Sequence, residues 1–274
     1  MSYKRILTIQ DISCVGQCSM TVALPILAAC GHEVCILPSE VLSTHTGGFS
    51  RPAVTDLSGG MEAIWRHWQR EGIVFDAIYT GYLGSVCAIE NAISIMDNLL
   101  APGGRIIVDP AMADNGKLYS GLTVEYAERM KDLCLHADVM LPNLTEAAMM
   151  TGLPFCENPN REDVLKLLEQ LDGKDVVLTG ATVDVGRTGA AIRENGSVSI
   201  HLHERLNCSL SGTGDIFAAA LTGAYMRDKT LAEAARIAAE FTLQCIRNTV
   251  QNPAHHYGVK FEPVLGHLIK MLNE

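Results

Sequence analysis

A turn bordered by two glycines, directly before an apolar helix, carries the clearest chemical signal in this sequence. The run Ser211-Gly212-Thr213-Gly214-Asp215 leads straight into the apolar residues 216–221. Two glycines at a helix start let several backbone N–H groups point one way at the positive end of the helix dipole, which favours an anion such as a phosphate. A carboxylate there would repel the anion unless it faces a second reactant. We therefore predict that Gly212, Thr213 and Gly214 stabilise a transferred phosphoryl group and that Asp215 accepts a proton from the attacking hydroxyl.

Two other nucleotide-binding motifs do not fit this turn. A Walker A loop requires GxxxxGK followed by Ser or Thr, and the sequence contains no such run. A dinucleotide-binding fingerprint requires a third glycine where Phe217 stands, and it belongs after the first strand of a fold. A plain structural role stays open, in which Asp215 is a first-turn helix acid stabilised by the dipole.

Acidic side chains follow two other predicted strands. Asp109 ends one strand, Asp114 lies five residues later in a polar loop, and Glu146 begins the helix after the next strand. Because Mg²⁺ prefers few carboxylates and keeps several waters, Asp109 and Asp114 suit magnesium coordination directly or through water, and Glu146 could help to hold the hydrated ion. The alternatives are a turn with solvated acids and, for Glu146, a capping box with Asn143. Thr179 ends a later strand, where it could meet nucleotide phosphates.

Polar and aromatic residues also follow the first three predicted strands. Asp11 and Ser13 follow the first strand, His45 and Thr46 follow the second, and Tyr82 follows the third. An aromatic ring, a histidine and hydroxyl groups that converge from neighbouring strand ends would suit a flat polar heterocycle. Each residue alone is more typical of helix capping or packing, so this interpretation depends on their convergence.

The segments that must position these residues alternate between short β-rich runs and amphipathic helical runs. Most β-rich runs are continuously apolar, which is typical of strands buried on both faces of a parallel sheet. The predicted strands are Tyr3–Gln10, Glu33–Pro38, Phe75–Thr80, Arg105–Asp109, Asp138–Leu141 and Asp175–Thr179. The pair Asn195-Gly196 predicts a hairpin between the runs Thr188–Arg193 and Ser197–His203.

Helix starts between the strands carry capping signals. Asp56 and Ser85 precede apolar helical patterns, and Thr230 with Glu233 forms a capping-box pattern before a helix that reaches about Thr249. This order of elements predicts an α/β fold with a doubly wound, mostly parallel sheet. We find no linker or repeat and expect residues 1–274 to form a single domain. Ligands of such sheets bind beyond the carboxyl ends of the strands, where the candidate residues lie.

The composition argues against several other classes of protein. The chain has 274 residues, of which 48% are hydrophobic, so it can bury a sizeable core. A formal net charge of −10 disfavours partners such as nucleic acid or anionic lipid. The longest mostly apolar run, Met20 to Cys30, is too short to span a membrane, and we expect no signal peptide. Nine cysteines occur singly, which predicts reduced thiols in a cytoplasmic protein.

Five of these segments, in this order along the chain, resemble the ribokinase-like superfamily and, within it, the pyridoxal kinase family. The five are Ser43 to Gly47, Thr80 to Tyr82, Asp109-Pro110 with Asp114 to Tyr119, Pro142 to Glu146, and Gly212 to Asp215. The resemblance implies a three-layer α/β/α fold with a mostly parallel central sheet. It also implies ATP-dependent phosphorylation of the 5′-hydroxymethyl group of a vitamin B6 vitamer, which is pyridoxal, pyridoxamine or pyridoxine.

The resemblance also assigns roles to individual residues. It implies that Asp215 is the catalytic base. It also implies that Asp114 and Glu146 lie at the metal and that Asn143 lies near the phosphates. Thr46 would bind the substituents of the pyridine ring and Tyr82 would pack on the ring. The implied cofactors are ATP and Mg²⁺, with a monovalent cation such as K⁺ left open. Family members are commonly dimers, so a homodimer is expected by analogy.

The sequence departs from the pyridoxal kinase pattern near its N-terminus. Many members have Ser where Asp11 stands and a Gly-Asn pair where Ser19 and Met20 stand. The run Asp11-Ile12-Ser13 is closer to the start of hydroxymethylpyrimidine kinases of thiamine synthesis. That activity, or that of another ribokinase-like small-molecule kinase, is one alternative. A non-catalytic protein that binds vitamin B6 or nucleotide is the other, and the intact Gly212-to-Asp215 segment argues against it.

Overall fold

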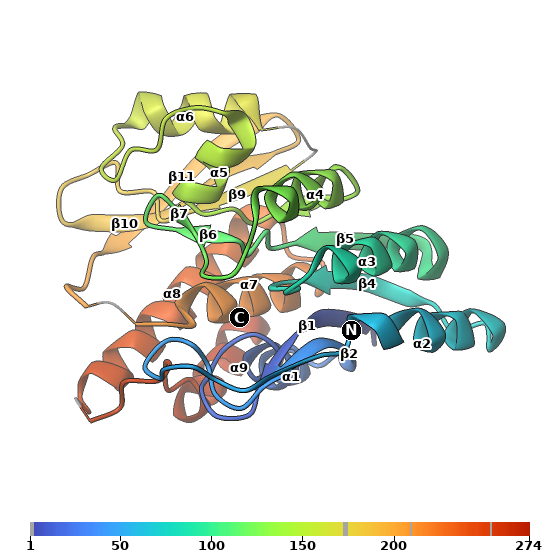
Figure 1. The fold of residues 1–274 in the computed structure, drawn as a ribbon. Helices are drawn as coiled ribbons and strands as arrows, with labels where there is room; N and C mark the ends of the chain where they lie inside the picture. The colour runs from blue at the N-terminus through green and yellow to red at the C-terminus, as the bar shows by residue number, and fades with distance from the viewer. Residues whose placement is uncertain (1–2, 172–174, 209, 253) are drawn as a thin grey trace.

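A mostly parallel sheet forms the centre of the molecule (Figure 1). The computed structural model describes residues 3–171, 175–208, 210–252 and 254–274. In that part of the chain, the strands of the large sheet follow the order β11-β10-β9-β8-β5-β4-β1-β2-β3. Neighbours from β2 to β9 in this order are parallel, whereas β3, β10 and β11 pair antiparallel. The strands span Arg5–Ser13 (β1), Glu33–Leu42 (β2), Val54–Asp56 (β3), Phe75–Thr80 (β4), Leu100–Val108 (β5), Val139–Met140 (β8), Asp175–Thr179 (β9), Arg187–Glu194 (β10) and Ser197–Glu204 (β11).

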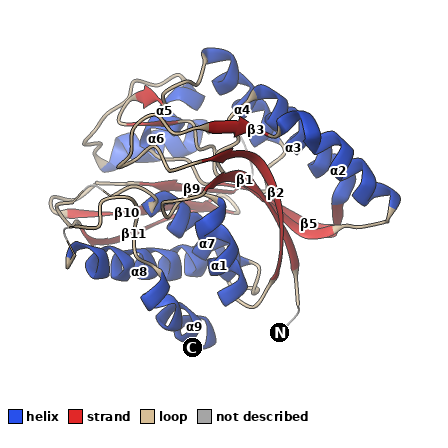
Figure 2. Cartoon of the chain, turned by 60° about the horizontal axis from the view of Figure 1, so that its bottom comes forward, coloured by secondary structure: helices blue, strands red, loops and turns tan. Residues whose placement is uncertain are grey.

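Helices cover both faces of this sheet (Figure 2). Helices α1, α7, α8 and α9 share one hydrophobic core with one face, and α2 to α6 share a second core with the other face. They span Met20–Ala29 (α1), Ser58–Arg70 (α2), Val86–Leu99 (α3), Val124–Leu135 (α4), Leu144–Thr151 (α5), Arg161–Gln170 (α6), Thr213–Tyr225 (α7), Leu231–Val250 (α8) and Leu265–Asn273 (α9), with a 3₁₀ turn at Glu262–Val264. The prediction of a three-layer α/β/α fold with a mostly parallel central sheet is confirmed.

The predicted capping signals begin three of these helices. The Ser85 side chain accepts the Ala88 N–H at the start of α3. Thr230 and Glu233 form a capping box at α8, and Asn143 with Glu146 forms a second one at α5. Each box satisfies backbone N–H groups that a helix leaves unpaired, so these ends are fixed locally by the sequence.

The first strand is longer than predicted, and this changes the setting of two candidate residues. The last residues of β1 pair with Val41 and Leu42 of β2 after a register shift at Gln10. Asp11 and Ser13 therefore lie in β1 and not in the loop after it. Irregularities of this kind re-aim side chains and are common beside active sites.

Short strands account for the other differences from the prediction. Strand β3 lies at the edge of the large sheet, and β6 (Ala113–Asp114) pairs with β7 (Lys117–Leu118) in the loop after β5. Such short strands contain too few residues to show an alternating pattern. Asp56, predicted to cap a helix, is the last residue of β3, and its carboxylate accepts the Ser58 N–H at 2.8 Å as α2 begins.

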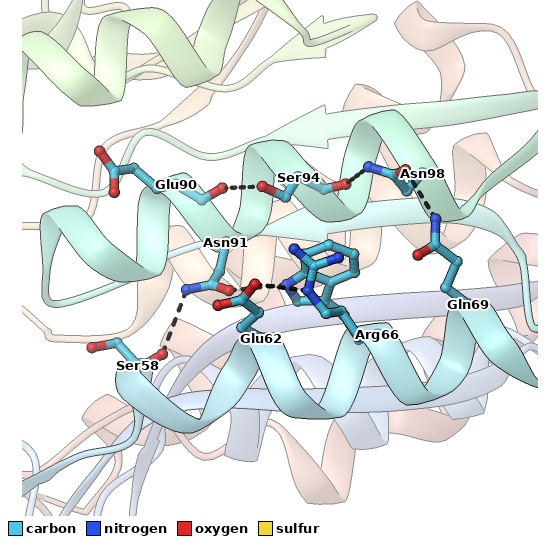
Figure 3. A network of polar contacts seen from close by, with 9 residues as sticks. Ser58, Glu62, Arg66, Gln69, Glu90, Asn91, Ser94 and Asn98 are labelled. Carbon is cyan, nitrogen blue, oxygen red and sulfur yellow. Dashed lines mark hydrogen bonds and ion pairs between the residues drawn. The ribbon is translucent and has the colours of Figure 1, made fainter.

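Polar side chains join α2 to α3, which lie side by side (Figure 3). The Asn91 amide on α3 accepts the Trp65 indole N–H at 3.0 Å and donates to the Ser58 carbonyl at 3.5 Å. Farther along, Gln69 donates to Asn98 at 3.0 Å. These contacts fix α3, whose first turn follows the loop that carries Tyr82.

All nine cysteines lie in the described residues and are free thiols, as expected from their spacing. Within the same residues, no helix combines the length and the apolar character needed to cross a bilayer.

Candidate active site

A cavity of about 600 Å³ lies at the carboxyl ends of the parallel strands. Its walls come from β1, the loops after the next parallel strands, the β10–β11 hairpin, the start of α7 and one face of α8. The predicted site residues that line it are Asp11, His45, Thr46, Tyr82, Asp109, Asp114, Asn143, Glu146, Thr179, Gly212, Thr213, Gly214 and Asp215. Ser13 is the exception among the predicted residues. It is fully buried and donates its hydroxyl to Asp11 at 3.3 Å, so it would reach a ligand only through that carboxylate.

The first turn of α7 lines the cavity, and its first backbone N–H groups have no hydrogen-bond partner among the described residues. Gly212 is the N-cap residue, and its φ of 84° is in the left-handed region that glycine adopts without steric cost. Among the described residues, no side chain caps this helix. The N–H groups of the first turn have no partner within any helix, and the helix dipole adds positive potential. This end of α7 can therefore hold an anionic group.

Asp215 lies in the same turn and also lines the cavity. It is part-buried and closely surrounded by protein, and this desolvation raises the pKa of its carboxyl group. The backbone N–H of Ser19 lies near the carboxylate and partly offsets that rise in the pKa. A carboxylate with a raised pKa is a better proton acceptor than an exposed aspartate.

The cavity is strongly acidic. Its lining includes the carboxyl groups of Asp11, Asp109, Asp114, Glu146 and Asp215, and its described residues include no Lys or Arg. Burial, with the charges of Glu146 and Asp215, raises the pKa of Asp109 well above its usual range. Nucleotide phosphates would add further negative charge, so favourable binding requires a cation that enters with them.

The acids at the α5 end of the cavity are better suited to hold a cation through water than to ligate it directly. The Glu146 carboxylate already accepts the N–H groups of Asn143 at 2.8 Å and Met112 at 3.1 Å. Asp114 accepts the Asn115 N–H at 2.8 Å but is exposed. In the described residues, no three metal-binding side chains converge on one point. Contact through water, which Mg²⁺ commonly keeps, fits these partly occupied oxygens.

Aromatic and polar residues line the other end of the cavity. The rings of Tyr82 and Tyr119 lie 6.4 Å apart, and burial raises the pKa of Tyr82 to about 12, so its hydroxyl stays protonated. His45 accepts the Gly47 N–H on Nδ1 at 3.0 Å, which leaves Nε2 to carry the proton of the neutral ring. Burial raises the pKa of Asp11 to about 6. A flat ring with polar substituents fits this mixture of groups.

A third group of lining residues was given no role by the sequence. Thr188 and His203 pair across the β10–β11 hairpin, and Ala239, Thr242 and Ile246 share one face of α8. The Thr242 hydroxyl is buried and has no hydrogen-bond partner among the described residues. The hairpin register and the helical spacing could have placed these residues together, but nothing in their types identifies a ligand.

Comparison with known proteins identifies the family of this chain. Residues 67–260 match the family model described as phosphomethylpyrimidine kinase. The chain belongs to this kinase family. It is 34% identical to Lactobacillus plantarum pyridoxal kinase, whose crystal structure superposes with a TM-score of 0.90 and 98% coverage of both chains. The resemblance to the pyridoxal kinase family of the ribokinase-like superfamily is thus confirmed.

Two further proteins are similar to this chain over most of its length. A Bacteroides thetaiotaomicron protein, described as a candidate phosphomethylpyrimidine kinase and solved in a form with pyridoxal, is 33% identical, with a TM-score of 0.90 and coverage of 97% of this chain and 96% of that one. The pyridoxine/pyridoxal/pyridoxamine kinase of Bordetella pertussis is 27% identical over 263 residues, which is 89% of each chain.

Proposed function

We propose that this protein transfers the γ-phosphoryl group of ATP to the 5′-hydroxymethyl group of a vitamin B6 vitamer, forming pyridoxal 5′-phosphate or its analogues. One observation carries the proposal: Asp215 and the unpaired N–H groups of α7 line the same cavity as Thr46 and Tyr82. The site therefore combines a proton acceptor, an anion-binding turn and a ring-binding surface. The names of the pyridoxal kinases among its relatives point to the same substrates.

In the proposed reaction, the vitamer alcohol oxygen attacks the γ-phosphorus while the bond to the β–γ bridging oxygen breaks and ADP leaves. Asp215 orients the alcohol and takes its proton. The N–H groups of residues 212–214 stabilise the charge on the transferred group. Thr179 and Asn143 lie along the expected path of the nucleotide phosphates. Tyr82 and Thr46 position the ring, and closure of the loop that carries Tyr119 would exclude water.

Magnesium is part of the proposal because the cavity is lined by acidic side chains. Its described lining residues include no Lys or Arg that could neutralise the phosphates. Asp114 and Glu146 would hold Mg²⁺ through water, with Asp109 nearby. Bound Mg²⁺ neutralises charge on the phosphates. We expect ADP release to require Mg²⁺, to fall to background with excess EDTA and to return when Mg²⁺ is restored, measured in a coupled ADP-release assay. Full turnover in EDTA would remove the metal from the proposal.

The same assay tests the proposed substrate. Pyridoxal, pyridoxamine, hydroxymethylpyrimidine and ribose are compared as acceptors, and pyridoxal 5′-phosphate is followed by its absorbance. Hydroxymethylpyrimidine is the second candidate, because the matching family model carries a phosphomethylpyrimidine kinase description. ADP release with hydroxymethylpyrimidine alone would favour thiamine synthesis. Binding of ligand without ADP release from any acceptor would favour a non-catalytic role.

Asp11 gives a prediction about the choice of vitamer. It lines the cavity and is 3% exposed, and many pyridoxal kinases have Ser here. A carboxylate favours a substrate with an ammonium group, so Asp11→Ser should lower kcat/KM for pyridoxamine by about 10-fold more than for pyridoxine, the net value of one charged hydrogen bond. Steady-state kinetics on both vitamers measure the ratio. An equal change for both would show that Asp11 does not select charge.

The family resemblance also supports a homodimer in the cytoplasm, with residues 1–274 acting as a single kinase domain and K⁺ as a candidate additional cation. The nine free cysteines fit a reducing compartment.

A further inference from the structure

An aromatic cluster joins two loops that lie far apart in the sequence. Phe49 belongs to the loop after β2 that also carries His45 and Thr46, and we call residues 45–49 the vitamer loop. The Phe49 ring lies 5.5 Å from the Tyr257 ring and 6.0 Å from the His256 ring. Both partners belong to the C-terminal loop, residues 254–258, which lies between α8 and the 3₁₀ turn. Ring centroids about 4.5–7 Å apart are typical of favourable aromatic pairs.

The backbones of the two loops also approach closely, at positions occupied by glycine. Gly48 has φ 91°, and a Cβ there would lie 2.6 Å from the His256 carbonyl oxygen and 3.2 Å from the Tyr257 Cα. Gly16, in the segment after β1, has φ 119°, and a Cβ there would lie 2.7 Å from the His45 Cβ. Glycine adopts such positive φ values without steric cost and lets another backbone come close. The C-terminal loop therefore packs on the vitamer loop through backbone as well as rings.

Hydrogen bonds tie both loops to the segment before α1. The Tyr257 carbonyl accepts the Gln17 N–H at 3.3 Å, and the Val15 carbonyl accepts the His45 N–H at 2.8 Å. Residues 45–47 line the cavity, whereas the rest of the vitamer loop contacts the C-terminal loop. A displacement of the second contact would therefore move the cavity wall.

We propose that Phe49 and Tyr257 are positioning residues, which hold the vitamer loop where His45 and Thr46 meet the ring of the substrate. Both rings are half-buried, and neither is among the described residues that line the cavity, so they act through the loop. The residues expected at the nucleotide phosphates come from other loops, so ATP binding is independent of the pair. This inference rests on the proposed function.

Phe49→Ala removes the ring contacts and leaves the backbone hydrogen bonds of the vitamer loop in place. The KM of pyridoxal should rise by about 3- to 10-fold, which corresponds to the loss of one aromatic pair. We expect kcat within about twofold of the parent, because Asp215 and its turn are unchanged. ATP affinity, measured by calorimetry, should not change. Phe49→Tyr keeps the ring and should keep the parent KM.

A double-mutant cycle tests whether the two rings act together. Tyr257→Ala should raise the KM of pyridoxal by a similar factor. The double variant Phe49→Ala/Tyr257→Ala should raise it no more than the larger single effect, because the same contact is lost only once. A double effect equal to the product of the two single effects would show independent roles and would overturn the proposal.

Trp68→Ala is the matched control for the loss of a half-buried ring. Trp68 on α2 lies 5.6 Å from the Phe75 ring, and neither residue is among the described residues that line the cavity. This variant should lower Tm and leave the KM of pyridoxal at the parent value. If it raises that KM as much as Phe49→Ala does, general loss of stability explains both effects and the proposal fails.

Gly48→Ala tests the backbone contact and serves where Phe49→Ala does not fold. The His256 carbonyl cannot rotate away from the added Cβ, so the vitamer loop must move and the KM of pyridoxal should rise by about 10-fold or more. Gly72→Ala is its control, because Gly72 has φ 67° and a Cβ there meets no described atom within 4 Å. Equal KM values for the two variants would contradict the proposal.

Calorimetric titration with pyridoxal gives the same comparisons without turnover. A parent protein that releases no ADP with any acceptor would contradict the proposed function, while pyridoxal binding by the variants would still test the aromatic pair. The two failures are therefore distinguishable.

Discussion

Asp215→Asn should lower kcat by about 10²–10⁴-fold while the fold and ATP binding are retained, which is the usual range for loss of a general base. The amide has nearly the same shape but cannot take the proton of the alcohol. Because burial raises the pKa of Asp215 and only the ionised carboxylate accepts a proton, parent kcat/KM should fall as pH drops through that raised pKa. The fall should begin at a higher pH than an ordinary aspartate, near 3.9, would give. Steady-state kinetics across pH and calorimetric ATP titration provide the measurements.

Glu125→Gln is the control that separates this role from a purely structural one. Glu125 is an exposed acid in the first turn of α4, where it interacts with the helix dipole as Asp215 does in α7. If Asp215 were only a dipole-stabilised acid, both variants would lose a little stability and neither would lose turnover. An Asp215→Asn enzyme within about twofold of the parent kcat would remove Asp215 from the mechanism.

Gly212→Ala should have the second-largest effect, with kcat reduced by about 10²-fold or more because the anion-binding N–H groups are displaced. Gly212 has φ 84°, and a Cβ there would overlap the Gln17 carbonyl oxygen. That oxygen belongs to the backbone and cannot rotate away, so the turn itself must move. Turnover and thermal melting are measured together, because some loss of Tm is also expected.

Gly152→Ala is the matched control for this substitution. Gly152 ends α5 with φ 73°, but a Cβ there meets no described atom within 4 Å. It therefore carries the conformational cost of alanine at positive φ without the overlap. If the two variants lose the same turnover, displacement of the anion-binding turn is not the cause.

The sequence predicted the fold well where the physical signal is local and repeated. Phe75–Thr80 and Asp175–Thr179 have the predicted bounds, because buried parallel strands are continuously apolar and end at polar residues. The capping box of Asn143 with Glu146 followed from types and spacing alone. The loops that follow strands β4 and β9 line the cavity, so predicting these strands also located part of the cavity wall.

The site was predicted less completely, for reasons of geometry. Ser13 was expected at the substrate because the first strand was predicted to end at Gln10. Pairing with β2 extends β1 through Ser13, which is buried and donates its hydroxyl to Asp11. Ser19 lines the cavity but was given no role, because its positive φ cannot be inferred from the sequence around it. The position of Thr242 in the cavity wall depends on the packing of α8 over the hairpin. This is a long-range contact that no local sequence pattern predicts.

The strand order has a consequence for biosynthesis. Strand β1 lies inside the sheet between β4 and β2, and its Asp11 shares the cavity with Asp215, which follows about 200 positions later in the chain. On the ribosome, the segment that carries Asp11 is therefore synthesised well before the turn that carries Asp215. A chain that terminates before α7 lacks Asp215 and the walls that α7 and α8 supply, so the cavity is complete only after both helices have been synthesised.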